Sequence, residues 1–157
     1  VFSRLAKYDR WATFQAEGLR FWEAYLELAE PPVIERLGVR FINQIHLGVE
    51  GKPCEFLKDV PALPKGMGLS RNLFFHQDTF RVDGYPYQIN WVRTAQPIPE
   101  NERVLIVDID ASTERIASLE PEVLLRHLAE MRFLKNRLFF TCMTDQALKQ
   151  FGKNDNE

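Results

Sequence analysis

The longest apolar repeat lies near the C-terminus of this 157-residue chain. Its members recur at intervals of three, four or seven residues, as on one face of an α-helix: Leu124, Leu128, Met131, Leu138 and Cys142. The repeat predicts a long helix that begins within residues 119–122, with Ser118 as its N-cap and Pro121 in its first turn.

Upstream, apolar and polar residues alternate as they do in strands that are covered on one side. The alternation predicts strands over residues 33–49 and 104–109, a short strand over residues 1–5, and a hairpin over residues 72–96. The Asp83-Gly84 pair favours a two-residue turn in that hairpin, which pairs Val82 with Tyr85 and Asp78 with Ile89. Asn43 falls on the apolar face of its strand, where it is either a hydrogen-bonded buried side chain or part of a bulge.

Two further helices are predicted. A broad aromatic stripe indicates a helix over residues 10–29, capped by Asp9 and ended by Pro31. A last turn over residues 146–151 follows a cap at Thr144 or Asp145. Residues 50–69, rich in Gly and Pro, predict a surface loop with one short helical turn at 54–58.

These elements define an α+β fold. We expect a mainly antiparallel sheet of at least four strands, covered on one face by the N-terminal helix and the long C-terminal helix as a two-layer sandwich. Length predicts a single domain over residues 1–151 with a frayed tail at 152–157. The chain opens on Val1, so we expect that an N-terminal segment with an edge strand is missing.

Composition narrows the function classes. The formal net charge of −2 makes nucleic acid an unlikely partner, and no apolar run is long enough to span a membrane. Cys54 and Cys142 form no CxxC pattern, which favours a reducing cytoplasm over a disulfide framework or zinc site. The sequence indicates no cofactor or metal, and it does not identify a small-molecule ligand.

Several segments resemble a sporadically distributed bacterial family of uncharacterised proteins. The matching motifs are RLGVRFINQI at residues 36–45, VDID at 107–110 and FFTCMTD at 139–145. Gln44 stands where that family tends to have Arg. The resemblance covers nearly the whole chain and implies a further N-terminal strand. It implies a fold and no particular activity.

One polar group stands out as a candidate site. Asp108 and Asp110 share one face of a strand, and Arg36 and Arg40 share the polar face of another. Paired carboxylates at this spacing either hold a divalent cation or form ion pairs with the two arginines. Lys135 lies within the main helical stripe, where it either reaches the edge, pairs with Asp108 or Asp110, or acts as a catalytic lysine.

Two other groups carry weaker signals. His76 and the arginines at 71, 81 and 93 on the hairpin either face an anion or form a solvated face. Phe133 and Phe140 align opposite the main helical stripe, with Ala129 close to their line. They are either covered within the monomer or form a twofold interface, which would make the protein a homodimer through its long helix.

These patterns leave two functional hypotheses. The first is a non-enzymatic binding or assembly module. It is supported by the high content of aromatic residues and by the two apolar faces of the long helix. The alternative is an enzyme that acts on a phosphorylated or nucleic-acid substrate through Asp108, Asp110, Arg36 and Arg40. An open cavity around those four side chains would favour the enzyme, and mutual pairing would favour the module.

Overall fold

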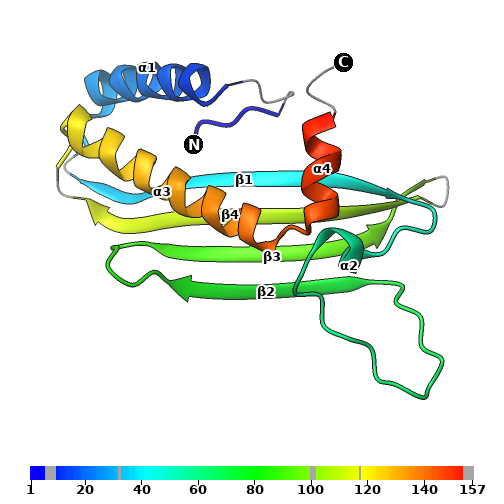
Figure 1. Cartoon of the computed structure of the whole chain (residues 1–157). Helices are drawn as coiled ribbons and strands as arrows, with labels where there is room; N and C mark the ends of the chain where they lie inside the picture. The colour runs from blue at the N-terminus through cyan, green and yellow to red at the C-terminus, as the bar shows by residue number, and fades with distance from the viewer. Residues whose placement is uncertain (6–9, 32, 100–101, 117, 154–157) are drawn as a thin grey trace.

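The computed structural model describes residues 1–5, 10–31, 33–99, 102–116 and 118–153. It is an α+β fold, as predicted, with an antiparallel four-stranded sheet and helices at both ends of the chain (Figure 1). The helices are α1 (Trp11–Ala29), α2 (Pro53–Phe56), α3 (Pro121–Cys142) and α4 (Asp145–Lys153). The strands are β1 (Ile34–Gly48), β2 (Phe74–Arg81), β3 (Gln88–Pro97) and β4 (Arg103–Ile116).

The sheet has the strand order β1-β4-β3-β2, so the last strand in sequence lies in its interior. Residues alternate between the two faces of each strand. The odd-numbered residues of β4 face α3 and are fully buried from Leu105 to Ala111, whereas Ile106 and Asp110 on the other face are only partly buried. The register places Phe41 and Trp91 on either side of Ile109, which extends this buried face across neighbouring strands.

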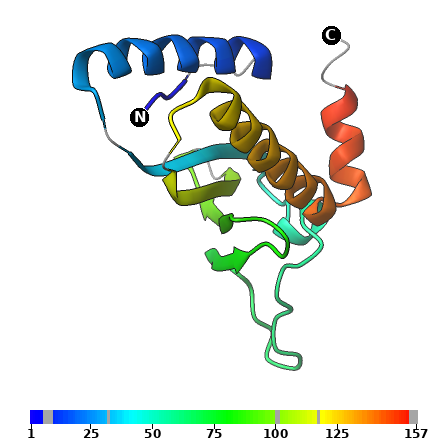
Figure 2. The same ribbon diagram turned by 90° about the vertical axis from the view of Figure 1, so that its left-hand side faces the viewer.

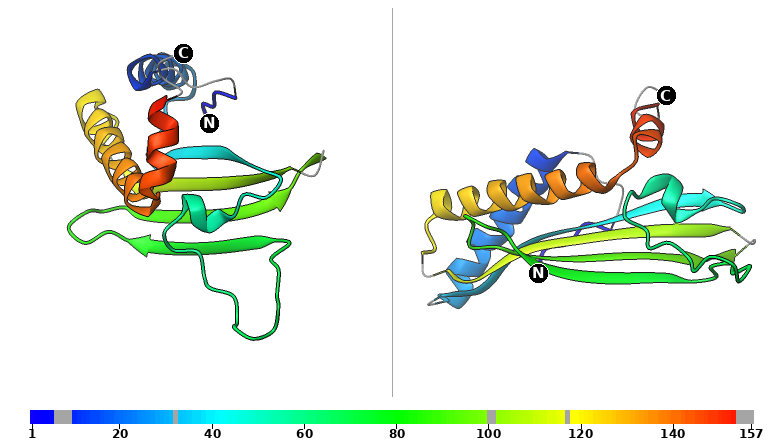
Figure 3. Two further views of the ribbon diagram at one scale, coloured as in Figure 1. Left: turned by 45° about the vertical axis from the view of Figure 1, so that its right-hand side comes forward. Right: turned by 60° about the horizontal axis from the view of Figure 1, so that its bottom comes forward.

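Helix α3 covers one face of the sheet diagonally (Figures 1 and 3). Its predicted stripe is its inner face, where Leu124, Met131 and Cys142 are buried. The core between α3 and the sheet includes, from the strands, Val39, Ile45, Ile89, Trp91, Ala95, Leu105, Val107, Ile109 and Ala111.

We call the opposite face of the sheet the open face, because no helix of the described residues lies over the middle of its strands (Figure 3). The side chain of Ile42 on β1 is 55% exposed there, and that of Phe75 on β2 is 64% exposed. An antiparallel sheet tolerates one solvated face, because its connections need not cross over both sides.

Helix α1 lies beyond the β1 edge of the sheet rather than over its centre (Figures 1 and 2). Trp11 contacts the ring of Phe41, and Trp22 packs against a small cluster that contains Ile34 and Leu124. None of the 19 residues of α1, all of them described, is buried. The helix ends at Ala29 because Glu30 adopts a left-handed conformation ahead of Pro31.

The predicted hairpin register is wrong by two residues. The structure pairs Asp78 with Trp91 and Phe80 with Ile89. The turn has one positive φ, at Gly84, whereas a two-residue type I′ turn needs two. Val82 instead donates its backbone N–H to the carbonyl of Tyr87 across a longer loop. A shift by two preserves the side-chain alternation, so the predicted faces hold.

Three local predictions also differ from the structure. Residues 1–5 form no strand, because Phe2 packs on Phe14 and Phe21 of α1. Strand β4 runs to Ile116, well past the predicted end at 109, because it pairs with β1 along that length. The N-cap of α3 is Glu120 rather than Ser118. The predicted Asp9 cap lies outside the described residues.

Helix α4 anchors the C-terminal end of α3 to the loop after β1. Thr144 caps α4, as predicted, by accepting a hydrogen bond from the backbone N–H of Ala147 (3.2 Å). Its hydroxyl also donates to the carbonyl oxygen of Glu55 in α2 (2.5 Å). Leu57 forms a β-bridge with Met143, and both side chains are buried. The first part of the predicted 50–69 loop therefore contributes to the core, and its later residues are exposed.

Candidate functional site

The polar group predicted from the sequence forms two ion pairs on the open face. Arg40 donates two hydrogen bonds to the carboxylate of Asp108, at 2.9 and 2.6 Å, and Arg36 donates one to Asp110 at 2.6 Å. Both contacts run diagonally across the β1–β4 ladder, because the register sets Arg40 opposite Asp110 and Arg36 opposite Glu114. The hydrogen bond to Asp108 raises the pKa of Arg40 above its usual value.

Each open-face ion pair combines an exposed arginine with a carboxylate that is buried at Asp108 and partly buried at Asp110. The side chain of Asp108 is 11% exposed, whereas that of Arg40 is 57% exposed. Asp110 Oδ1 is buried and has no hydrogen-bond partner in the described part of the chain. Among the described residues, no group of three or more His, Cys, Asp or Glu side chains is arranged to hold a metal ion.

Asp108→Ala is expected to lower the free energy of unfolding by about 1 kcal/mol, because an exposed Arg40 regains water when it loses its partner. Urea denaturation of wild type and variant measures this loss. Glu35→Ala, which removes an exposed carboxylate from the same sheet, is the matched control. A loss of about 3 kcal/mol or more would instead indicate that Arg40 is left as a buried, unpaired charge.

Lys135 does not join this group, which corrects the predicted pairing with Asp108 or Asp110. It projects from α3 onto the opposite face of the sheet, and only 8% of the residue is exposed. Its Nζ lies 3.6 Å from the centroid of the Phe41 ring. Burial, with a smaller effect of nearby Arg132, lowers the pKa of Lys135 to about 8. The ring of Phe41 therefore stabilises the charge of Lys135 through a cation–π contact.

A pocket of about 260 Å³ opens beside Lys135 between α3 and β1. Asn43 of β1 lines it and donates its side-chain amide to the carbonyl of Val107 (3.1 Å). Asn43 is therefore hydrogen-bonded, and the β1 ladder continues past it without a bulge. Arg132, Asn136 and Phe140 complete the α3 side of the pocket.

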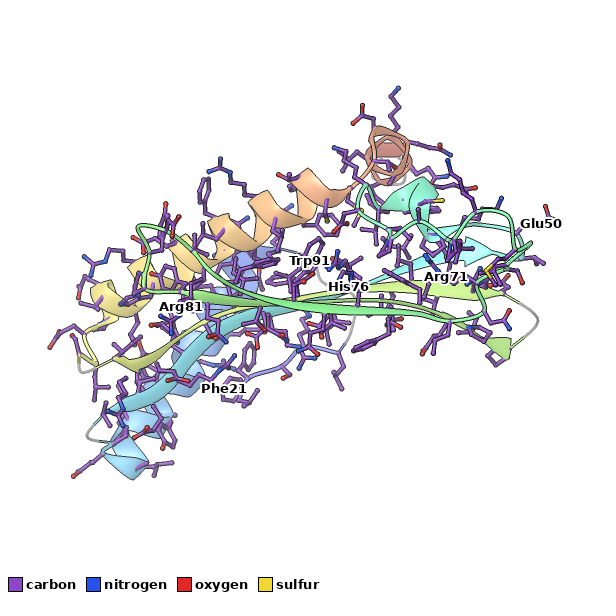
Figure 4. The ribbon with its side chains drawn as sticks, turned by 90° about the horizontal axis from the view of Figure 1, so that it is seen from below. Phe21, Glu50, Arg71, His76, Arg81 and Trp91 are labelled. Carbon is purple, nitrogen blue, oxygen red and sulfur yellow. The ribbon has the colours of Figure 1, made fainter. Side chains whose placement is uncertain are left out.

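A second buried cation, Arg93, was singled out by the sequence only as one of the hairpin cations, which either face an anion or form a solvated face. Arg93 is 1% exposed and lies on the α3 face, where its guanidinium forms ion pairs with Asp59 and Asp78. The guanidinium carbon lies 3.6 Å from the centroid of the Trp91 ring. His76 and Trp91 lie on this side of the sheet (Figure 4). The hairpin cations therefore do not share one solvated face.

Two further side chains, His76 and Cys142, lie close to the ion pairs of Arg93. His76 Nε2 lies 3.6 Å from Asp78 Oδ1. Burial, together with nearby Asp59, raises the pKa of the Cys142 thiol to about 12, which keeps it protonated and unreactive at neutral pH. Arg93 lies two residues from both Trp91 and Ala95, so it shares their face of β3. The alternation along β3 was therefore the signal in the sequence that Arg93 faces the core.

The predicted interface residues lie on the outer face of α3. Phe133 is 54% exposed and Phe140 is 56% exposed, and Ala129 is exposed beside them. The alternative that α1 or the 50–69 loop covers the two rings within the monomer is therefore wrong. In the described part of the chain, no helix is both long and apolar enough to cross a membrane.

Comparisons with known proteins identify no relative of this chain. No family model, curated protein or solved structure matches this chain. Functional inference therefore rests on the geometry of the molecule.

Proposed function

We propose that this chain is a non-enzymatic assembly module of the cytoplasm that self-associates through the outer face of α3. The observation that carries the proposal is the exposure of Phe133 and Phe140 on a helix whose other side already contacts the core. Burial of a phenylalanine ring contributes about 2 kcal/mol relative to exposure. A second copy of the chain supplies that burial with twofold symmetry.

The outer face of α3 is complementary to itself. Its exposed residues lie within about 40° of the Phe133 direction at 100° per residue: Glu122, Arg126, Ala129, Phe133, Arg137 and Phe140. An antiparallel pair of α3 helices that cross next to Ala129 sets Glu122 of one copy opposite Arg137 of the other. The same register sets Arg126 over Phe133, and the small side chain of Ala129 allows close approach.

The enzymatic alternative is less well supported. A phosphorylated or nucleic-acid substrate would need Arg36 and Arg40 to be available, and Asp108 and Asp110 to be free for chemistry. All four side chains already engage one another, which supports a structural role for the open-face ion pairs.

Sedimentation velocity tests the assembly proposal. Wild type is expected to sediment as a dimer, and Phe133→Glu as a folded monomer, because a carboxylate at the centre of the interface loses its water without gaining a partner. Met67→Glu makes the same kind of change at an exposed loop position and should leave the dimer intact. A wild type that stays monomeric at high concentration would rule the proposal out.

A further inference from the structure

Lys135 is an unusual side chain for the core side of a helix. Only 8% of the residue is exposed, and its Nζ lies over the ring of Phe41 rather than beside a carboxylate of the open-face ion pairs. Its contact with the Phe41 ring offsets part of the loss of water around the ammonium group. A buried cation that lacks a carboxylate partner is costly, and an anion in the adjoining pocket would supply that partner.

The pocket beside Lys135 has the composition of an anion site. Its polar lining combines the cations Lys135 and Arg132 with the amides Asn43 and Asn136, and it includes no acidic residue within the described part of the chain. Arg132 and Lys135 are three residues apart on α3, so their side chains lie on neighbouring faces. An anion between them would neutralise both cations at once.

The remaining lining of the pocket is aromatic. Phe41 forms the β1 side, and Phe139 and Phe140 form the α3 side. The rings of Phe139 and Phe140 meet edge to face with centroids 5.5 Å apart. Such a surface favours an apolar group beside the anionic one, as in other small-molecule sites that pair apolar walls with a few polar groups.

We propose that this pocket binds a small organic carboxylate, with its carboxylate between Lys135 and Arg132 and its apolar part against Phe41, Phe139 and Phe140. A planar carboxylate suits a bidentate contact with Arg132. The pocket volume of about 260 Å³ fits a compact ligand. This site shares Phe140 with the proposed interface, but it rests on Lys135 and Arg132 and does not require self-association.

Binding raises the proton affinity of Lys135. Burial lowers the pKa of this amine to about 8 in the free protein, and a bound anion moves the pKa back toward its usual value. Ligand binding near pH 8 should therefore take up protons, which calorimetry in buffers of different ionisation enthalpy detects. This readout separates an anion beside Lys135 from one held elsewhere on the surface.

The test uses isothermal titration of the full chain with benzoate and hexanoate, alongside their neutral amides. Both carboxylates are expected to bind wild type at least tenfold more tightly than the amides. Lys135→Met should weaken carboxylate binding at least tenfold and abolish the proton uptake. Lys149→Met, which removes an exposed lysine from α4, should bind as wild type does. Lys135→Met should remain folded, because methionine fills the same space without a buried charge.

Several results would overturn the proposal. These are the absence of carboxylate binding, equal binding of acids and amides, or unchanged binding by Lys135→Met. Tighter binding of inorganic phosphate than of benzoate would replace the organic carboxylate with another anion. A change in the sedimentation of Lys135→Met would assign the pocket to the protein interface. The Phe133→Glu variant should retain carboxylate binding, so the assembly proposal can fail while this one stands.

Discussion

Arg93→Met should destabilise the protein by roughly 2–3 kcal/mol, although methionine preserves most of the side-chain volume. The guanidinium is 1% exposed and contacts Asp59, Asp78 and the Trp91 ring. Breaking a buried ion pair costs about 3–5 kcal/mol. The expected loss is smaller here because the side chains of Asp59 and Asp78 are 44% and 33% exposed and can regain water.

Thermal unfolding measures this effect, and the loss should lower Tm on the order of 8 °C for a chain of this size. Arg81→Met is the matched control, since Arg81 lies on the same hairpin and is exposed. It should change stability by no more than about 0.5 kcal/mol. An Arg93→Met variant as stable as wild type would mean that the Arg93 group contributes nothing to the fold.

Leu105→Ala should cost about 3 kcal/mol, while its neighbour Ile106→Ala should cost about 1 kcal/mol. Leu105 is fully buried in the core on the helix-covered face of the sheet, and truncating it leaves a cavity there. Ile106 points to the open face and is partly exposed, so its truncation loses less buried area. The shift in urea midpoint at constant slope gives both values. Equal losses would show that both faces of β4 are packed alike.

The alternation of residues was sufficient to predict the faces of the sheet. Phe80, Ile89 and Trp91 share one face in the structure, as the pattern predicted, although the hairpin register moved by two. The register of β1 against β4 could not be read from the sequence, because the two strands are separated by more than 50 residues. Only three-dimensional packing sets such non-local contacts.

The candidate sites were predicted less completely. Shared polarity was enough to pair Arg36 and Arg40 with Asp110 and Asp108. The hairpin hypothesis named Arg93 but not its burial or its partners, because a charged residue in a hairpin is usually solvated and its partner Asp59 comes from a distant loop. Lys135 was placed correctly on the inner stripe of α3. Its contact with Phe41, however, depended on how the helix crosses the sheet.

Exchanging the charges on the outer face of α3 tests the proposed assembly most directly. Glu122→Arg and Arg137→Glu each place like charges opposite one another in the antiparallel pair, and combining them restores opposite charges. Circular dichroism confirms that each variant is folded.

The measurement is sedimentation velocity at a concentration where wild type should be dimeric. Self-association through α3 predicts that each single variant sediments as a monomer and that the double variant sediments as a dimer. A double variant that dimerises no better than the single variants, or a wild type that never dimerises, would contradict it.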